Sequence, residues 1–332
     1  MYNVGIIRHF YYKNYPLILK EAKMKHIFII NPAAGAENST EYIRGLLKKS
    51  NLNIDYSIHT TAHSGEATEF VKNTLSASDE THRFYACGGD GTLNEVINGV
   101  VGYPNAEVSV FPCGSGNDYV KYYGTADDFS DIKELVNAKS HKVDVLKIGD
   151  KYAINAVHFG LDSYVLKTMI KVRRNVILGK KRAYTTGVVA GFIGGMKTFC
   201  SLKADGKALA GDKILLCTLA NGKYVGGSYK SAPLSLNDDG FIEVLAVNPI
   251  SRLRFLTLMN TYKKGNHLED RRFDKYLNYK KAKTVEVSSP SEIPVSIDGE
   301  LVHLKDFTVE IVPSAVNFVA PDRLTEKKKV TV

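Results

Sequence analysis

The segment from Gly88 to Glu95 reads Gly-Gly-Asp-Gly-Thr-Leu-Asn-Glu and places three glycines within four positions. Glycine permits positive φ angles and lets backbone N–H groups approach a ligand closely, and a helix that begins here would add the positive end of its dipole. This chemistry favours a phosphate group. Asp90 would repel a bare phosphate, but its carboxylate suits Mg²⁺, the water shell of that ion or ribose hydroxyls. The alternative is a tight turn capped by Asp90.

Two further loops have a similar composition. The segment Gly114-Ser-Gly-Asn-Asp118 again combines small residues with hydroxyl, amide and carboxylate groups. The segment Asn31-Pro-Ala-Ala-Gly35 could hold adenine, ribose or phosphate through its main-chain groups. Three such loops in one chain point to a nucleotide or another phosphorylated ligand.

The elements that must position these loops follow from the apolar pattern. Strands are predicted at 26–30, 54–59, 83–87 and 108–111, of which 26–30 and 83–87 are expected to be buried, and helices after Ser39 or Thr40, at 66–75 and at 93–100. Strands that alternate with helices form βαβ units and a parallel sheet, whose ligand loops lie at the carboxyl ends of the strands. Because each loop directly follows a predicted strand, we expect the three loops to meet at one edge of the sheet.

The pattern changes after about residue 140, where short strands with polar connections predict an antiparallel sheet or sandwich. The expected strands are 143–148, 151–156, 201–204, 214–219, 240–247, 284–288, 294–297 and 308–312. Helical interruptions are expected around 163–199 and 250–263. The chain is therefore expected to have an α/β first part and a β-rich second part.

Composition limits the classes of protein that fit. The chain has 332 residues and a net charge of +9, which favours two domains and an anionic partner. Its four cysteines form no Cys-x-x-Cys pair, so a disulfide framework and a zinc site are disfavoured and a reduced cytosolic setting is expected. No apolar run reaches the roughly 18–20 residues that span a bilayer. Residues 1–23 show no signal-peptide pattern, and we expect them to be an N-terminal extension.

Several known phosphate and metal motifs are absent from the sequence. The Gly-Lys pairs at 179–180, 206–207 and 222–223 lack the remaining residues of a P-loop, and Tyr119 stands where a dinucleotide fingerprint needs glycine. The protein-kinase motifs are also missing. His59 and His63 are spaced for a helical metal site, but they fall at a predicted strand end and loop. The scattered tyrosines come with no RNA-binding signature, so no nucleic-acid partner is expected.

The two longest glycine motifs, Gly88 to Val96 and Phe111-Pro-Cys-Gly-Ser-Gly-Asn-Asp118, closely resemble the diacylglycerol kinase catalytic superfamily, which includes bacterial lipid kinases, sphingosine kinases and ceramide kinases. NAD kinases and phosphofructokinases share a similar Gly-Gly-Asp-Gly turn. Later motifs distinguish the groups because they occur in the order and approximate spacing of the bacterial diacylglycerol kinases. They are Asn155, Phe159-Gly-Leu-Asp162, Tyr224-Val-Gly-Gly227, Pro233, Asp238-Asp-Gly-Phe241 and Ile297-Asp-Gly-Glu300.

The resemblance, which runs from about residue 25 to about 320, implies two domains with the active site between them. The first is an α/β domain like those of phosphofructokinase and NAD kinase, and the second is a β-rich sandwich. We place the nucleotide-binding domain at 24–140 and the lipid-substrate domain at 141–315, with 316–332 returning to the first.

The resemblance also assigns residues to ATP binding, position by position. The family usually has Thr where this chain has Ser115, and the hydroxyl is kept. The implied set is Asn31, Pro32, Ala33, Ala34, Gly35, Thr61, Gly88, Gly89, Asp90, Gly91, Thr92, Leu93, Asn94 and Ser115. Asp118 would help to place Mg²⁺ or the reacting groups.

The second domain is implied to carry a further Mg²⁺ and the catalytic base. The metal ligands would be the side chain of Asp239 and main-chain oxygens of Leu236 and Phe241. The Asp298-Gly-Glu300 turn resembles the catalytic motif of the family, and a carboxylate there can accept the proton of an attacking hydroxyl. Asp298 is the first choice for this base and Glu300 the second; without the family, an ordinary hairpin turn would be the alternative.

The resemblance implies an ATP- and Mg²⁺-dependent lipid kinase, with diacylglycerol as the leading acceptor. The alternatives are a soluble-substrate kinase like NAD kinase and a catalytically silent ATP-binding protein at membranes. The basic and apolar stretch from Lys171 to Phe199 suggests an anionic membrane surface as partner, with a solvated helix face as the alternative. We expect a cytoplasmic, membrane-peripheral protein; the oligomeric state is open, a homodimer being one option.

Overall fold

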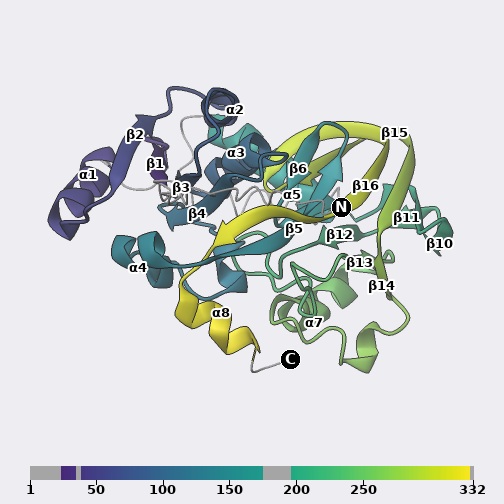
Figure 1. The fold of residues 1–332 in the computed structure, drawn as a ribbon. Helices are drawn as coiled ribbons and strands as arrows, with labels where there is room; N and C mark the ends of the chain where they lie inside the picture. The colour runs from purple at the N-terminus through teal and green to yellow at the C-terminus, as the bar shows by residue number, and fades with distance from the viewer. Residues whose placement is uncertain (1–23, 35–38, 175–195, 330–332) are drawn as a thin grey trace, which may run out of the picture.

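The computed structural model describes residues 24–34, 39–174 and 196–329 of the chain (Figure 1). Three sequence-based expectations therefore lie outside the described residues. They are the extension at 1–23, the ligand residue Gly35 and most of the basic and apolar stretch that ends at Phe199.

The first half of the chain forms a parallel sheet of four strands in the order β2-β1-β3-β4. The strands are β1 (Lys25–Ile30), β2 (Asp55–Thr60), β3 (His82–Gly88) and β4 (Ala106–Pro112). Every residue of β3 is buried, as its apolar run predicts for a central parallel strand. The expected α/β architecture is confirmed.

Helices alternate with these strands. They are α1 (Ser39–Ser50), α2 (Glu66–Ser76), α3 (Asp90–Val100) and α4 (Ile132–Asn137), with 3₁₀ turns η1 (Val120–Tyr122) and η2 (Asp127–Phe129). In α3 the residues Leu93, Val96, Ile97 and Val100 are buried. This spacing matches the helical period and fixes which side of α3 faces the sheet.

The second half is rich in antiparallel strands, as expected for the β-rich domain. Its strands are β5 (Ser140–Ile148), β6 (Lys151–Ala153), β7 (Ala156–Gly160), β8 (Thr198–Phe199), β9 (Ser201–Ala204), β10 (Lys207–Ala210), β11 (Lys213–Ile214), β12 (Leu216–Ala220), β13 (Ile242–Val247), β14 (Leu277–Ala282), β15 (Thr284–Ile297) and β16 (Glu300–Val319). The main path runs β14-β13-β12-β7-β15-β16. Its helices are α5 (Leu161–Arg174), α7 (Arg252–Lys263), the 3₁₀ turn η3 (Arg271–Phe273) and α8 (Asp322–Lys329).

Several expected strands are wrong in their extent. The expected strands 284–288 and 294–297 are one strand, β15, and the expected strand 308–312 is part of the longer β16. The sequence predicts a single strand over 151–156, but the structure has β6 and β7 separated by Ile154 and Asn155. The backbone N–H groups of Ile154, Asn155 and Ala156 all donate to the carboxylate of Asp298. The chain leaves the strand here because a side chain, rather than a neighbouring strand, accepts its hydrogen bonds.

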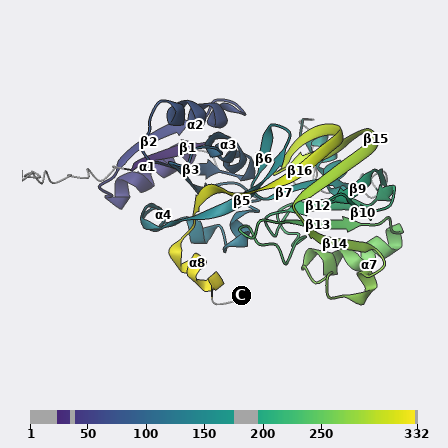
Figure 2. The ribbon, with the colours of Figure 1, turned by 45° about the vertical axis from the view of Figure 1, so that its right-hand side comes forward.

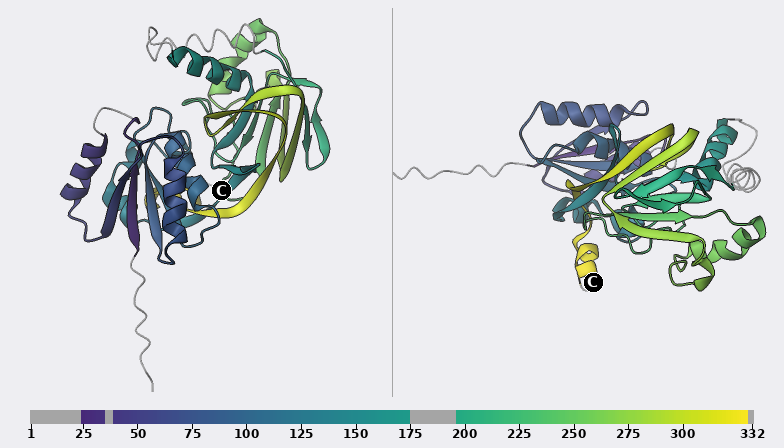
Figure 3. Two further views of the ribbon diagram at one scale, coloured as in Figure 1. Left: turned by 90° about the horizontal axis from the view of Figure 1, so that it is seen from above. Right: turned by 90° about the vertical axis from the view of Figure 1, so that its right-hand side faces the viewer.

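Strand β16 joins the two halves into one continuous sheet (Figures 1 and 2). Its first part pairs with β15, its later part with β5, and its last residues, Asn317 to Val319, run parallel to β4. Val316 and Phe318 belong to the same buried core as β1, β3 and β4. Seen from above, the two halves lie side by side and this strand passes between them (Figure 3).

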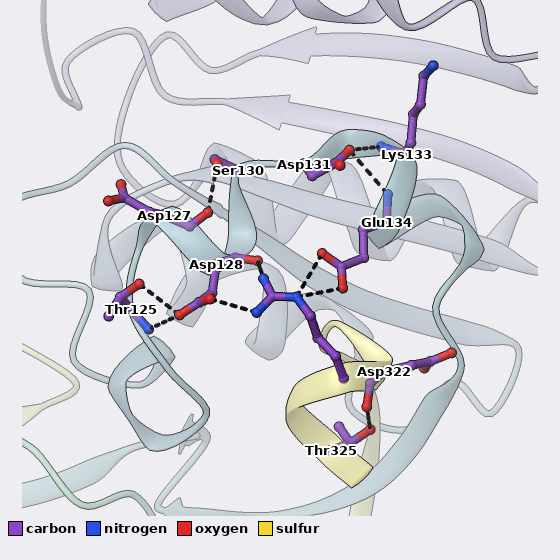
Figure 4. Close-up of polar contacts among 10 residues, drawn as sticks. Thr125, Asp127, Asp128, Ser130, Asp131, Lys133, Glu134, Asp322 and Thr325 are labelled. Atoms are coloured by element: carbon purple, nitrogen blue, oxygen red, sulfur yellow. Dashed lines mark hydrogen bonds and ion pairs between the residues drawn. The ribbon is translucent and has the colours of Figure 1, made fainter. Parts of the chain in front are cut away.

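After β16, the chain ends in α8, which packs against the first half (Figure 4). The Arg323 guanidinium contacts the carboxylates of Asp128 in η2 and Glu134 in α4, at 2.7 and 3.0 Å. Hydrogen bonds from Thr125 and Arg323 lower the pKa of Asp128 to about 2. Among the described residues, no helix is both long and apolar enough to cross a bilayer.

Candidate active site

The two longest glycine loops meet at the carboxyl edge of the parallel sheet. The N–H groups of Cys113 and Gly114 donate to the carbonyl of Gly88, at 2.8 and 3.2 Å. A Cβ atom at Gly114 would lie 2.5 Å from the Cα of Gly89, so only glycine allows this approach of one backbone to the other. The loops form a single surface at the N-terminus of α3, which suits a phosphate group.

The third predicted loop lies beside them. The Asn31 side chain donates to the Thr92 hydroxyl at 3.2 Å, and its Oδ1 accepts from the N–H of Ala33 at 2.9 Å. Thr61 lies at the end of β2 and donates its N–H to the carbonyl of Ile30 at 2.9 Å. Pro32 and Ala33 are exposed, and Ala34 is half-buried. The structure thus gathers the described members of all three loops at one sheet edge.

Two carboxylates lie within this surface. Asp90 Oδ1 accepts from the N–H of Asp118 at 2.6 Å, and no donor reaches Asp90 Oδ2 among the described residues. Burial, and next the nearby carboxylate of Asp118, raise the pKa of Asp90 to about 6. The Lys121 ammonium supplies a positive charge 2.9 Å from Asp118 Oδ1, and Asp90 still offers its Oδ2 as an oxygen ligand, so the pair could hold Mg²⁺.

The raised pKa of Asp90 predicts a gain in stability when its charge is removed. The ordinary pKa of an aspartate is 3.8 and that of Asp90 in the folded protein is about 6, so the folded state holds the proton more tightly and its stability falls as the pH rises from about 4 to 6. We expect Asp90→Asn to raise the Tm of the nucleotide-free protein in EDTA at pH 8 by about 2–4 °C, and by less at pH 5. Thermal unfolding at both values measures this.

The control for Asp90→Asn is Asp79→Asn, because Asp79 is exposed. This control should change the Tm little at either pH. A lower Tm for Asp90→Asn at pH 8 would show that the Asp90 carboxylate stabilises the fold rather than straining it.

Lys121 in η1 is a site residue that the glycine motifs do not reveal. Its Nζ donates to the carbonyl of Gly116 at 2.6 Å, to Asp118 Oδ1 at 2.9 Å and to the carbonyl of Gly227 at 2.5 Å. The N–H of Gly227 also donates to Asp118 Oδ1, at 2.9 Å. Lys121 therefore orients Asp118 and holds the second loop against the second half. The only sequence signal is a lysine three positions after Asp118.

Asp298 occupies a different position from the one expected for a proton acceptor. Its carboxylate is buried and accepts four hydrogen bonds, from Asn94 Nδ2 and Ile154 N at Oδ2, and from Asn155 N and Ala156 N at Oδ1, all at 2.8–3.0 Å. Burial raises its pKa and these hydrogen bonds oppose the shift. Because donors already occupy both oxygens, the carboxylate of Asp298 holds the turn in place, and its role as the base stays a prediction.

Glu300 has the freedom that Asp298 lacks. Its side chain is exposed and makes no hydrogen bond or ion pair with the described residues. Its Oε1 lies 3.5 Å from the position that a Cβ at Gly91 would occupy. The acidic turn of the second half therefore faces the Gly-Gly-Asp-Gly loop of the first, with the Glu300 carboxylate beside Gly91.

The remaining predicted nucleotide residues differ in what they face. Both N–H groups of the Asn94 amide are used, by the carbonyl of Tyr152 at 2.8 Å and by Asp298, so Asn94 links the two halves. Leu93 is buried and lines a cavity, and the Thr92 hydroxyl accepts from Asn31. Ser115 is exposed on the second loop, where its hydroxyl can reach a ligand.

A cavity of about 480 Å³ begins at these loops and extends between the halves. Its polar end includes Asp90, Ser115, Asp118 and Asp298. Its other end is apolar and is lined by Val165, Leu166, Leu215, Phe255, Leu258 and Met259. Asp162 also lines it, and burial raises the pKa of this carboxyl to about 6. The volume of the cavity is that of a small-molecule site. Its polar end and its apolar end together suit a ligand that has a polar and an apolar part.

At the second predicted metal site, a lysine side chain lies beside the expected carboxylate ligand. The Nζ of Lys281 lies 2.6 Å from Asp239 Oδ2 and 3.3 Å from Oε1 of the buried Glu243. Asp239 Oδ1 accepts from the N–H of Phe241 at 3.1 Å. The ammonium group already supplies the positive charge that Mg²⁺ would bring to Asp239. The set of Leu236, Asp239 and Phe241 therefore stays a prediction as a metal site.

The Lys281 contacts predict that a metal can stand in for the ammonium. In Lys281→Met, Asp239 and Glu243 lose their shared cation, and we expect the unfolding free energy to fall by about 1–3 kcal/mol. Millimolar Mg²⁺ should restore part of this lost unfolding free energy in the variant. It should raise the unfolding free energy of the wild type by less, because Lys281 already occupies the site. Urea unfolding with Mg²⁺ or EDTA measures both effects.

The control for Lys281→Met is Lys207→Met, at an exposed position in β10. It should show neither the loss nor the rescue. Equal stability of Lys281→Met and the wild type in EDTA would contradict the role given to the ammonium group.

Family models match both halves of the chain. Residues 25–148 match the diacylglycerol kinase catalytic domain, and residues 155–320 match the YegS C-terminal NAD kinase beta sandwich-like domain. A diacylglycerol kinase of Bacillus subtilis is 28% identical over 291 residues, which cover 82% of this chain and 88% of that protein. A diacylglycerol kinase of Staphylococcus carnosus is 27% identical over 283 residues, 82% of this chain and 87% of that protein.

A solved structure shares the fold. The crystal structure of a diacylglycerol kinase from Bacillus anthracis is 21% identical, superposes with a TM-score of 0.64, and covers 90% of this chain and 98% of its own. The catalytic-domain match precedes the sandwich-domain match along the sequence, which is the order that the motifs predict. The chain therefore belongs to the diacylglycerol kinase family and is a lipid kinase.

Proposed function

We propose that the protein transfers the γ-phosphate of ATP to a hydroxyl group of a membrane lipid, with diacylglycerol as the leading acceptor and phosphatidic acid as its product. The observation that supports this most strongly is the position of Glu300. Its carboxylate faces Gly91 in the phosphate-binding surface, at the polar end of a cavity whose other end is apolar. The names of the relatives in B. subtilis and S. carnosus support the same acceptor.

In the proposed reaction, the three glycine loops bind the triphosphate through their backbone N–H groups. Mg²⁺ held at Asp90 and Asp118 would neutralise the β- and γ-phosphates. Glu300 accepts the proton of the lipid hydroxyl as that oxygen attacks the γ-phosphorus and the bond to the β-γ bridging oxygen breaks. Asp298 holds the turn that carries Glu300, and Lys121 holds Asp118. Catalysis by these residues is chiefly positioning and charge stabilisation.

The apolar end of the cavity supports a lipid over a soluble acceptor. The side chains Val165, Leu166, Phe255 and Met259 offer no hydrogen bonds to a nucleotide or a sugar. Burying an acyl chain against them is favourable by about 0.8 kcal/mol for each CH₂ group. This lining disfavours the NAD-kinase-like alternative. The exposed Glu300, which has no partner among the residues that the structure describes, disfavours a catalytically silent protein.

The proposed setting is the cytoplasm, where ATP is supplied, with the protein bound peripherally to the inner face of the membrane. The membrane lipid and the anionic membrane surface are then its partners. Phospholipid biosynthesis is the process that such a product would serve. No nucleic-acid partner is part of this proposal, and a homodimer remains one option.

The proposal is tested by incubating the purified protein with γ-labelled ATP, Mg²⁺ and a total lipid extract. We expect a single labelled phospholipid, whose acceptor mass spectrometry will identify. The control is the Glu300→Gln protein under the same conditions. Label on NAD or another soluble acceptor, with none on lipid, would overturn the lipid assignment; ATP binding with no transfer to any acceptor would favour the silent protein.

A further inference from the structure

Helix α7 presents one side to the cavity of the active site. Phe255, Leu258, Met259 and Tyr262 line the cavity, and their spacing of three and four residues places them on one side of the helix. Leu258 is almost fully buried. This inner side forms part of the wall around the apolar end, where we place the acyl chains of the substrate.

The opposite side of α7 is also apolar in part, although it contacts little of the protein. Leu253 is 75% exposed and Leu256 is 54% exposed, and the two lie three residues apart on that side. Leu253 is the most exposed large apolar side chain among the described residues. Two neighbouring leucines kept in water need a reason, because a solvated helix face is normally polar.

The surroundings of these leucines are basic. Residues 251–276 carry seven basic and three acidic side chains, which give a net charge of +4. The whole chain has a net charge of +9, so this segment of less than a tenth of its length holds a large share of it. Helix α7 itself contains no acidic residue, and Lys263 and Lys264 are exposed at its C-terminal end. Exposed leucines among cations are the composition of helices that lie in the interface of an anionic bilayer.

We propose that the outer side of α7 docks the protein on an anionic lipid surface, with Leu253 and Leu256 inserted below the headgroups and Lys263 and Lys264 among the phosphates. This inference rests on the proposed function and identifies the surface through which the substrate is reached. The inner side of the same helix lines the cavity. The bilayer and the site proposed for the acyl chains would therefore lie on opposite sides of α7, separated by one helix.

Charge distinguishes this partner from the other partners that could cover two leucines. A second copy of the chain would bring the same cations against themselves. The stretch from Lys171 to Phe199 of this chain is itself basic and contains no acidic residue, so its charge does not complement α7 either. An anionic bilayer offers both negative charge and an apolar interior, which the outer side of α7 requires together.

The test compares the full-length wild type with Leu253→Ser/Leu256→Ser and with Lys263→Gln/Lys264→Gln. Co-sedimentation is measured with vesicles of phosphatidylcholine alone and of phosphatidylcholine with 30% phosphatidylglycerol, at about 0.05 and 0.5 M salt. The matched control is Tyr42→Ser, which removes a similarly exposed apolar residue from α1 in the other half (Figure 1). Phosphorylation of a short-chain, micelle-dispersed diacylglycerol is measured in parallel.

We expect the wild type and Tyr42→Ser to bind only the anionic vesicles, and less at high salt. The leucine variant should bind at least 10-fold more weakly and the lysine variant several-fold more weakly, while activity on the dispersed acceptor stays within about 2-fold of the wild type. The docking surface would be overturned if the leucine variant bound the anionic vesicles as strongly as the wild type does. It would also be overturned if the wild type bound both kinds of vesicle equally, or if it bound a second copy of itself in place of vesicles. Absence of transfer to the dispersed acceptor by the wild type would instead refute the proposed function.

Discussion

Glu300→Gln is expected to lower the kcat for lipid phosphorylation by about 10²- to 10⁴-fold, the range that removal of a general base produces. The side chain keeps its size but can no longer accept the proton of the lipid hydroxyl. Its carboxylate makes no hydrogen bond with the described residues, so the Tm should stay within about 1 °C of the wild type. Initial rates at saturating ATP and lipid, with thermal unfolding on the same samples, measure both quantities.

The matched control for Glu300→Gln is Glu292→Gln, an exposed glutamate on the same hairpin. It should leave the rate and the Tm unchanged, whereas Glu300→Asp should recover part of the lost activity because the carboxylate is kept. A Glu300→Gln protein with a near wild-type kcat would remove Glu300 as the base.

Asp298→Asn is expected to lower stability and activity together. The carboxylate accepts four hydrogen bonds in a buried position, and an amide can accept on one atom only. The NH₂ group of the asparagine would face buried N–H donors and leave about two of them unsatisfied, at about 1–3 kcal/mol each. We expect the unfolding free energy to fall by about 2–5 kcal/mol. Urea unfolding and the kinase assay on the folded fraction measure the two effects.

Asp205→Asn provides a comparison with similar backbone geometry. Asp205 also has a positive φ in a turn and its Oδ1 accepts two backbone N–H groups, but it is exposed. Water can satisfy those donors, so the loss should be under about 1 kcal/mol. If Asp298→Asn were as stable as the wild type yet inactive, Asp298 and not Glu300 would be the base.

The positions of the glycine loops could be predicted because their causes are local. Apolar runs such as His26–Ile30 and Arg83–Cys87 specify buried strands, and Gly-rich segments specify where the strands end. The rule that loops gather at the carboxyl edge of a parallel sheet then brings Asn31, Gly88 and Gly114 together. The same reasoning gave the α/β first half and the β-rich second half.

The roles of individual side chains were harder to predict because they depend on contacts between distant residues. Asp298 meets Asn94, 204 residues earlier, and three main-chain N–H groups that leave no mark in the sequence. Lys281 lies 42 residues from Asp239, and nothing in its neighbours distinguishes it from the other lysine of β14. The resemblance of the motifs located the acidic turn. Only the structure showed that the carboxylate of Asp298 accepts four hydrogen bonds whereas that of Glu300 accepts none from the described residues.

The strand that passes from one half of the molecule to the other limits how the enzyme can move. Strand β16 pairs with β15, β5 and β4 in turn, so a clamshell opening of the halves would have to break ladder hydrogen bonds in a buried sheet. The shared sheet therefore resists separation of the two halves. The lipid and its charged product would then exchange through movement of the helices that line the cavity, α5 and α7, rather than through separation of the two halves.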